Sequence, residues 1–146
     1  MILGYKQITP WGELTSFATK IVYGRKKHTL RADPNNRWKA GMKIQHALGV
    51  RTKKYVQFAE GECKSVQKII IEEGYERGEY SYNYFFEKRK VWNVKRFRVK
   101  VDGKSLRRKE IDILARNDGF ETTDDLFRWF INGFEGKIIH FTNLRY

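Results

Sequence analysis

Apolar and polar residues alternate most regularly over residues 92–101 of the chain. Three apolar side chains fall on one side of an extended chain: Phe97, Val99 and Val101. The cations between them fall on the other side: Arg96, Arg98 and Lys100. This period of two predicts a strand with one buried face and one cationic face. Asp102-Gly103, which follows it, is typical of a tight hairpin turn.

Weaker patterns predict five more extended segments, at residues 27–31, 42–48, 63–73, 74–90 and 136–146. The segment 42–48 alternates Met42, Ile44, His46 and Leu48 with polar residues, and 63–73 is rich in β-branched residues and ends at Gly74. Residues 33–36, DPNN, have turn chemistry. Residues 49–61 show no clear period, which predicts a basic loop.

Three segments have helical spacing. Residues 11–24 predict an opening helix closed by Gly24 in a left-handed cap. Ile111, Leu114 and Ala115 predict a second helix that ends near Gly119. A third helix, capped by Thr122 or Thr123, contains further apolar residues: Leu126, Phe127, Phe130 and Ile131.

The 146 residues contain no repeat, no linker and no low-complexity segment, so we expect one domain over 1–146. Short, mostly antiparallel strands with a few short helices predict an α+β fold. Such strands are best closed into a small β-barrel with the helices packed at its side.

The net charge of +13 is the strongest compositional signal, and it is unevenly spread. Residues 20–54 and 88–109 each hold eleven Lys or Arg and one acid, whereas residues 110–135 hold seven acids and two bases. Nucleic acid is the polyanion that such a surface most often binds. Two alternatives stay open: a solvated basic exterior, and a basic face that meets an acidic protein or a second copy.

Other features narrow the setting. Cys63 is the only cysteine, which favours a reducing, cytoplasmic environment. No apolar run is long enough for a membrane span, so we expect no membrane partner. His28, His46 and His140 lie in separate segments without the spacing of metal ligands, and we expect no metal, no cofactor and a monomer.

Three short motifs occur in an order that resembles a known family, the ASCH domain of the PUA-like superfamily. The first is Gly24, Lys26, Thr29 and Arg31, which matches a Gly-x-Lys-x-x-Thr-x-Arg pattern. The second is Lys39-Ala40-Gly41 before a strand, with Met42 where an Asp is frequent, and the third is LARNDGFETTDDLFRWF at 114–130. The likeness covers most of the chain. Residues 75–95, rich in Tyr and cations, look like an elaboration.

The resemblance implies a PUA-like pseudobarrel with flanking short helices and a cleft for RNA or a nucleotide. Some bacterial members of the family are amidohydrolases that remove the acetyl group from acetylated cytidine. They use a Lys, a Thr and an acid, which match Lys26, Thr29 and, by position, Asp118. The acid is usually Glu, so Asp118 is one methylene shorter.

The residues themselves set conditions on that chemistry. A threonine hydroxyl needs a neighbouring base, and Lys26 could serve only if burial and nearby cations lower its pKa. Asp118 would hold the ammonium but would also raise that pKa. In a regular strand Lys26 and Thr29 point to opposite faces, so they converge only if Lys26 lies in the turn after Gly24.

Two functions from different classes follow. In the first, RNA or a nucleotide binds in a basic cleft, where the ligand-binding residues are Lys26, Arg31, Trp38 and Lys39. Trp38 would stack on a base or, alternatively, plug one end of the barrel. A surface for the polymer is expected at Arg89, Lys90, Arg96, Arg98 and Lys100. In the second, the chain is a nucleoside deacylase in which Lys26, Thr29 and Asp118 are catalytic.

Overall fold

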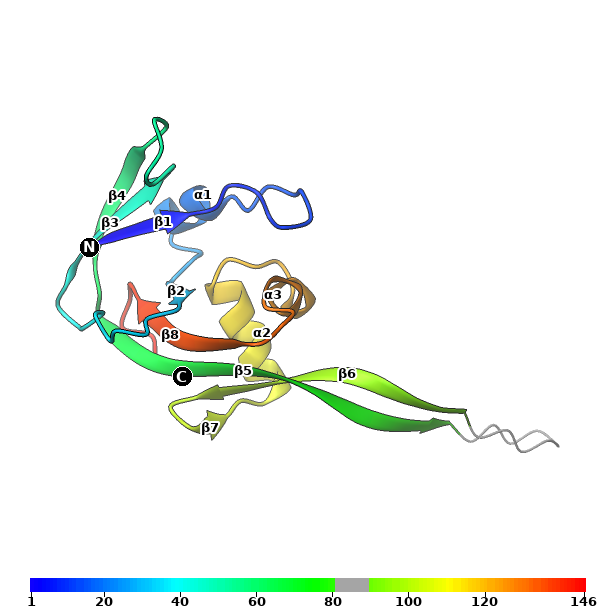
Figure 1. Ribbon diagram of the computed structural model, residues 1–146. Coiled ribbons are helices and arrows are strands. Elements are labelled where there is room, and N and C mark those ends of the chain that lie inside the picture. Colours follow the sequence, from blue (N-terminus) through cyan, green and yellow to red (C-terminus); the bar gives the residue numbers. More distant parts are fainter. Residues whose placement is uncertain (81–89) are drawn as a thin grey trace.

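The computed structural model describes the backbone of residues 1–80 and 90–146 and the side chains of residues 1–74 and 96–146. Figure 1 shows the arrangement of the elements. In chain order these are β1 (Ile2–Tyr5), α1 (Phe17–Val22), β2 (His28–Arg31), β3 (Lys43–Leu48), β4 (Val56–Glu62), β5 (Ser65–Tyr80), β6 (Lys90–Val101), β7 (Lys104–Ser105), α2 (Arg108–Asn117), α3 (Thr123–Trp129) and β8 (Phe134–His140).

The described strands form two sheets. The smaller sheet has the order β1-β3-β4, with β1 parallel to β3, and the larger has the order β2-β8-β5-β6-β7 and is antiparallel throughout. The α+β class is therefore confirmed. Neither sheet closes into a barrel within the described residues, so the expected pseudobarrel is not confirmed.

The strand with the clearest alternation forms as predicted. Val99 and Val101 of β6 are 1% and 2% exposed, while Arg96 and Arg98 on the opposite face are exposed. Asp102 and Gly103 both have positive φ and connect β6 to β7 in a tight turn. Burial of one face is what the period of two encodes.

Two strands do not follow from the apolar pattern. The prediction of a loop at 49–61 is wrong, because Val56–Glu62 forms β4 and pairs antiparallel with β3. Most of its residues are only half-buried, so backbone pairing rather than apolar burial holds it. The sequence also gives no sign of β1, which runs parallel to β3 with Leu3 opposite His46.

Several element boundaries also differ, and the closing strand expected over 136–146 covers Phe134–His140. The opening helix is shorter than predicted and begins only at Phe17, because Ser16 has a left-handed conformation and Ile8 pairs with Leu14 in a β-bridge. The strand expected to end at Gly74 continues to Tyr80 opposite β6. Figure 1 shows this β5–β6 ribbon extending away from the rest of the chain. Of the expected elaboration at 75–95, residues 75–80 and 90–95 belong to this ribbon, and the side chains of 75–95 lie outside the described residues.

The two later helices are confirmed. In α2, Ile111, Leu114 and Ala115 are buried as their spacing predicts. Thr122 caps α3 by accepting a hydrogen bond from the Asp125 N–H. The helix ends at Trp129, so Phe130 and Ile131 lie just beyond it. No helix in the described part of the chain has the length and apolar character to cross a membrane.

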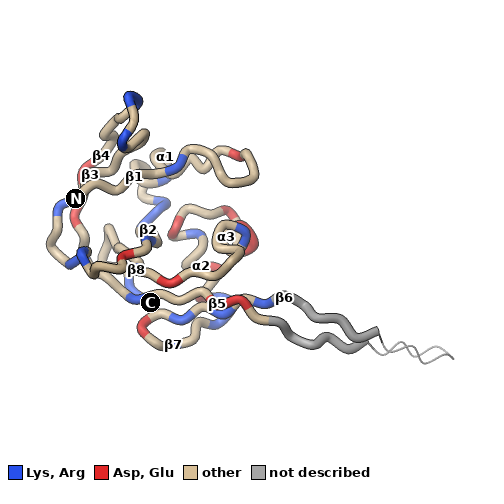
Figure 2. Tube along the Cα trace, viewed as in Figure 1, with Lys and Arg blue, Asp and Glu red and all other residues tan. Residues whose placement is uncertain are grey.

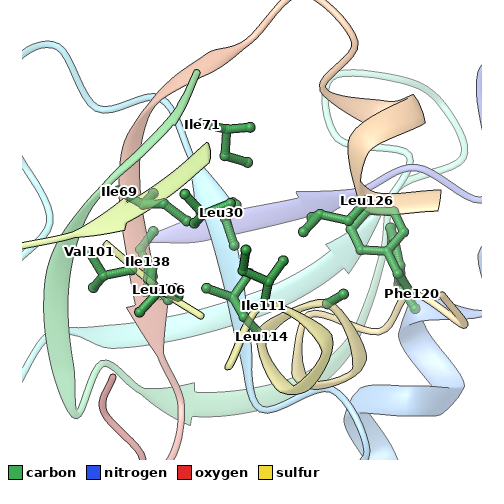
Figure 3. Packing of buried hydrophobic residues seen from close by; sticks show 14 of the residues in the cluster. Leu30, Ile69, Ile71, Val101, Leu106, Ile111, Leu114, Phe120, Leu126 and Ile138 are labelled. Atoms are coloured by element: carbon green, nitrogen blue, oxygen red, sulfur yellow. The ribbon is translucent and has the colours of Figure 1, made fainter. Parts of the chain in front are cut away.

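The core joins the larger sheet to these helices. Leu30, Ile69 and Ile138 come from three strands and lie close to Leu114 of α2 and Leu126 of α3 (Figure 3). All five are buried, so the hydrophobic effect fixes β2 next to the end of α2. That junction positions the candidate site.

Candidate functional site

Lys26 is positioned by the turn that ends α1. Gly24 has a φ of 73°, the left-handed conformation predicted for it, and the next two backbone N–H groups both donate to the Lys20 carbonyl, at 2.8 and 2.9 Å. Lys26 therefore precedes β2, which begins at His28. Because it lies outside the strand, its side chain reaches the same cavity as that of Thr29, as the chemistry requires.

Asp118 approaches from the opposite side, at the C-terminal end of α2. The Lys27 N–H donates to the Asn117 carbonyl at 2.7 Å and ties the two segments together. Lys26 Nζ lies 2.9 Å from Asp118 Oδ1 and also donates to the Asp118 carbonyl. The two side chains are 1% and 5% exposed, so this is a buried ion pair.

These residues line a cavity of about 140 Å³, which we call the Lys26 pocket. Its lining is mixed polar and aromatic: Tyr5, Lys6, Phe17, Lys26, Thr29, Leu30, Arg31, Asp118, Phe120, Trp129 and Phe130. The structure thus brings together the four predicted residues Lys26, Thr29, Arg31 and Asp118. The lining, apolar walls with a few convergent polar groups, is that of a ligand site, and the volume is smaller than the roughly 300–1,000 Å³ of most ligand pockets, so it suits the reacting group of a ligand.

Thr29 and Arg31 occupy the β2 side of the pocket. Thr29 is 4% exposed, and its hydroxyl makes no hydrogen bond within the described part of the chain. Arg31 donates from Nη2 to the Gly4 carbonyl, and its guanidinium lies 5.2 Å from the centre of the Tyr5 ring. Arg31 is therefore fixed against β1, while the Thr29 hydroxyl is available to a ligand.

Burial and charge act in opposite directions on Lys26. Burial lowers the pKa of Lys26 to about 8, with help from Arg31 and Lys20, although Asp118 acts in the opposite direction. The conflict expected from the sequence is thus resolved in favour of burial. A large fraction of Lys26 is then neutral at mildly alkaline pH, which a general base requires.

Asp118 has two partners. Burial alone would raise the pKa of Asp118, but the Lys26 ammonium and the His28 side chain outweigh burial and hold that pKa below its ordinary value. His28 Nδ1 lies 3.3 Å from Asp118 Oδ1. Burial in turn lowers the pKa of His28, so this imidazole is neutral. Asp118 is therefore an ionised carboxylate at neutral pH.

Trp38 and Lys39 lie apart from the Lys26 pocket. Trp38 is 6% exposed and belongs to the hydrophobic core, and its backbone N–H donates to Asp33 Oδ2 at 3.0 Å. Asp33 also accepts from the Arg37 N–H, so its carboxylate organises this loop and turns Trp38 inward. Lys39 is exposed, and neither residue is among those lining the pocket.

Arg96 and Arg98, two of the residues predicted to contact a polymer, line a second, larger hollow, which we call the arginine groove. It measures about 520 Å³ and is lined by Arg96, Phe97, Arg98, Leu106, Arg108, Ile111, Thr123, Asp124, Phe127, Arg128 and Ile131. Four cations face one carboxylate over an apolar floor in which the rings of Phe97 and Phe127 stack at 4.5 Å. Lys100 pairs with Glu72 at 3.3 Å instead, and the side chains of Arg89 and Lys90 lie outside the described residues.

Sequence reasoning missed the aromatic wall of the Lys26 pocket. Phe17, Phe120 and Trp129 pack against one another with ring centres 5.6 to 5.8 Å apart. Lys26 Nζ lies 4.5 Å from the centre of the Phe17 ring. Phe120 and Trp129 fall within the 114–130 motif, and that motif was the only signal in the sequence that these two rings lie near the site. Tyr5 had none, because β1 was not predicted.

Charge is distributed over the fold in a way that links distant segments. Figure 2 shows acidic residues along the loop before α3 and cations around β2. Glu121 of that loop lies 2.9 Å from Lys20 Nζ and also pairs with Arg25. The acidic block thus meets the first basic block beside the pocket.

Comparison with models of protein families, with curated proteins and with solved structures found no match.

Proposed function

We propose that the Lys26 pocket binds an acylated nucleoside, of the acetylated cytidine kind, and hydrolyses its amide. The observation that carries the proposal is the convergence of a buried Lys26–Asp118 pair and a Thr29 hydroxyl in one cavity. This arrangement supplies a nucleophile, a base and a group that orients the base. The resemblance to the ASCH family supports the same assignment, and the PUA-like pseudobarrel remains part of the proposal.

The pocket suits chemistry better than it suits a phosphate backbone. Asp118 already neutralises the Lys26 ammonium, and the pair is almost fully buried. A cation contributes most to the binding of a phosphate backbone when it is exposed and unpaired, because it must reach the phosphates and displace their counterions. A neutral acyl amide needs no such charge, and the aromatic wall offers an apolar surface for its base.

The reaction can be written in balanced steps. Thr29 Oγ attacks the acyl carbon while its proton passes to Lys26 Nζ. The carbon–nitrogen bond then breaks, and Lys26 returns the proton to the leaving amino group of the base. Water hydrolyses the threonyl ester, so the net change is amide plus water giving amine plus carboxylic acid. Arg31 lies at the rim to polarise the carbonyl oxygen.

The test is deacetylation of acetylated cytidine followed by chromatography. We expect turnover by the wild type and loss of turnover in Lys26→Ala and in Thr29→Val. Lys27→Ala is the matched control, because Lys27 is the exposed neighbour and its side chain is not part of the pocket. A folded wild type without turnover, or equal losses in Lys26→Ala and Lys27→Ala, would overturn the proposal.

A second candidate function, binding of single-stranded RNA, is favoured by the arginine groove. Its lining combines four arginines with the stacked rings of Phe97 and Phe127, and guanidinium and aromatic groups are those that RNA modules use for phosphates and bases. Affinity should fall with salt, with a log–log slope of about −0.7 for each phosphate contacted. Arg96→Gln/Arg98→Gln should reduce both affinity and slope. The control is Lys53→Gln/Lys54→Gln, which removes the same charge from an exposed loop.

We keep the predictions of a cytoplasmic setting and a monomeric state as part of the proposal. The acidic residues of 110–135 could instead support self-association, which gel filtration at two salt concentrations would reveal. A constant monomeric elution volume would support the proposal, and a dimer that dissociates in high salt would contradict it.

A further inference from the structure

We infer that His28 is a positioning residue, which holds Asp118 against Lys26 through its Nδ1–H, and that the Tyr146 phenol fixes the imidazole in that tautomer. The catalytic consequence rests on the proposed function, whereas the tautomer does not depend on any substrate. Neither His28 nor Tyr146 lines the Lys26 pocket, so they act behind it.

His28 lies at the start of β2 and is fully buried. Its two ring nitrogens face different groups. Nε2 lies 2.7 Å from the Tyr146 hydroxyl, and Nδ1 lies 3.3 Å from Asp118 Oδ1. Nδ1 has no partner that meets hydrogen-bond geometry in the described structure, and Asp118 Oδ1 at 3.3 Å is the carboxylate oxygen it faces.

The hydrogen-bond donors that link Asn117, Tyr146 and His28 can be assigned in order, starting from Asn117. Asn117 Nδ2 donates to the Tyr146 hydroxyl at 3.1 Å, which leaves the phenolic hydrogen free to donate elsewhere. Burial raises the pKa of Tyr146, so the phenol keeps this hydrogen. His28 Nε2 is then the acceptor, and a neutral imidazole must carry its one hydrogen on Nδ1, facing the carboxylate.

Tyr146 is itself held firmly. Its N–H donates to Gln67 Oε1, and its carbonyl accepts from Gln67 Nε2, both at 2.9 Å. Gln67 Oε1 also lies 3.1 Å from His140 Nε2, and the ring of His140 packs against that of His28 at 5.4 Å. The phenol is therefore presented to His28 by backbone and side-chain bonds together.

The consequence for the site is geometric. Lys26 Nζ donates to Oδ1 at 2.9 Å and His28 Nδ1 lies 3.3 Å from the same oxygen, so an Nδ1–H would favour this one orientation of the ionised Asp118 carboxylate. In the other tautomer a nitrogen lone pair would face that carboxylate and repel it. Outer partners of this kind orient a reactive group without touching the substrate, and in metal sites their loss costs 10-fold or more.

The decisive measurement is a long-range proton–nitrogen NMR spectrum of the substrate-free wild type at neutral pH. We expect the His28 signals of the Nδ1–H tautomer. In Tyr146→Phe, which keeps the ring but removes the hydroxyl, we expect a shift towards the Nε2–H tautomer and a fall in kcat of about tenfold with KM unchanged. An Nε2–H tautomer in the wild type would overturn the inference.

A matched pair of variants separates positioning from packing. The amide nitrogen of His28→Asn occupies the Nδ1 position, and that of His28→Gln occupies the Nε2 position, so Asn should retain more turnover than Gln. Equal turnover in the two folded variants would overturn the inference. A wild type with Nδ1–H but without turnover overturns only the proposed reaction and leaves the positioning contact supported.

Discussion

Lys26 gains its reactivity from a compromise between burial and charge. A fully buried lysine without a partner loses its proton readily, whereas a lysine in an exposed ion pair keeps it. Here a buried carboxylate keeps Lys26 in place, yet burial still lowers the pKa of Lys26 to about 8. The one-methylene-shorter acid does not break the pair, because Asp118 and Lys26 still meet at 2.9 Å.

The pH dependence of turnover follows from this pKa. Only neutral Lys26 can accept the Thr29 proton, and its neutral fraction rises as pH increases through about 8. We therefore expect kcat/KM for acetylated cytidine to rise from pH 6.5 and to level off near pH 9.5, with an apparent pKa of about 8. Initial rates across this range test it. A profile that is flat or falls with pH would exclude neutral Lys26 as the base.

The ion pair also predicts a pattern in stability. Asp118→Asn leaves the Lys26 ammonium buried beside a neutral amide, and breaking a buried pair in this way typically costs about 3–5 kcal/mol of unfolding free energy. The double variant Lys26→Met/Asp118→Asn removes the stranded charge. It should lose less unfolding free energy than Lys26→Met and Asp118→Asn lose in sum. Urea unfolding of all four proteins measures this coupling. Additive losses would show that the pair is not coupled in the fold.

At the level of elements, the site depends on how closely β2 packs against β8. The two strands pair antiparallel, with Thr29 opposite Ile139 and Arg31 opposite Lys137. Gly136 immediately precedes this pairing, and a Cβ built there would lie 2.5 Å from the Arg31 carbonyl oxygen and 2.6 Å from the Phe134 ring. No side chain fits at this position without moving the strand that carries Thr29.

Gly136→Ala should therefore lower the unfolding free energy by about 1–3 kcal/mol, the typical cost of overpacking, and should also lower turnover. Gly74→Ala is the matched control. It also adds a methyl group within a strand, but the nearest atom, the Arg96 carbonyl oxygen, is 3.8 Å away. Thermal and urea unfolding of both variants measure the difference. Equal stability would show that β2 and β8 can separate without cost.

Element prediction succeeded where burial is one-sided. The alternation in β6 and the helical spacing in α2 each mark a single apolar face, and both elements formed at the expected residues. β4 was missed because its half-buried residues carry little apolar signal, and β1 because four residues are too few to show a period. Pairing with β3 decides both, and for β1 it joins segments far apart in the sequence, with Ile2 opposite Gln45.

The same distinction applies to the site. Local motifs contain Lys26, Thr29 and Asp118, and the sequence states the condition for the first two to converge, a Lys26 in the turn after Gly24, which the structure meets. The roles of Tyr5 and Tyr146 could not be predicted, because their contacts span long stretches of chain: Tyr146 meets His28 across 118 residues. Trp38 illustrates the reverse problem. Its loop position left two alternatives open, stacking on a base or packing into the fold, and the structure buries it in the core with its backbone N–H bonded to Asp33.

At the scale of the whole molecule, the basic surplus is partly organised rather than merely exposed. Burial of Lys26 with Asp118 and the pairing of Lys20 and Arg25 with Glu121 join the first basic block to the acidic block. Lys20 and Arg25 in turn hold the pKa of Glu121 below its ordinary value. High salt should therefore act on the arginine groove, the exposed loops and the exposed Glu121 pairs more than on Lys26–Asp118, because a buried pair is screened less.

The three buried histidines make the stability of the whole fold depend on pH. Burial lowers the pKa of each, to about 4 for His46 and about 3 for His140, and also below its ordinary value for His28. The unfolded chain takes up these protons near pH 6.5, whereas the folded chain does not. The unfolded state therefore binds more protons between about pH 6.5 and 4, and stability must fall as pH is lowered through this window.

The expected slope is about 1.4 kcal/mol of unfolding free energy per pH unit for each histidine that stays neutral, up to three times that in total. Urea unfolding at pH 8.0, 7.5, 6.5, 5.5 and 5.0 measures it, and the histidine contribution should level off above about pH 7.5, where these groups are neutral in both states. Carboxylates contribute mostly at the lower end, so the interval from 6.5 to 5.5 is diagnostic. Imidazole NMR signals give the independent check: a histidine that titrates near pH 6.5 in the folded protein cannot contribute, and three such histidines would remove the effect.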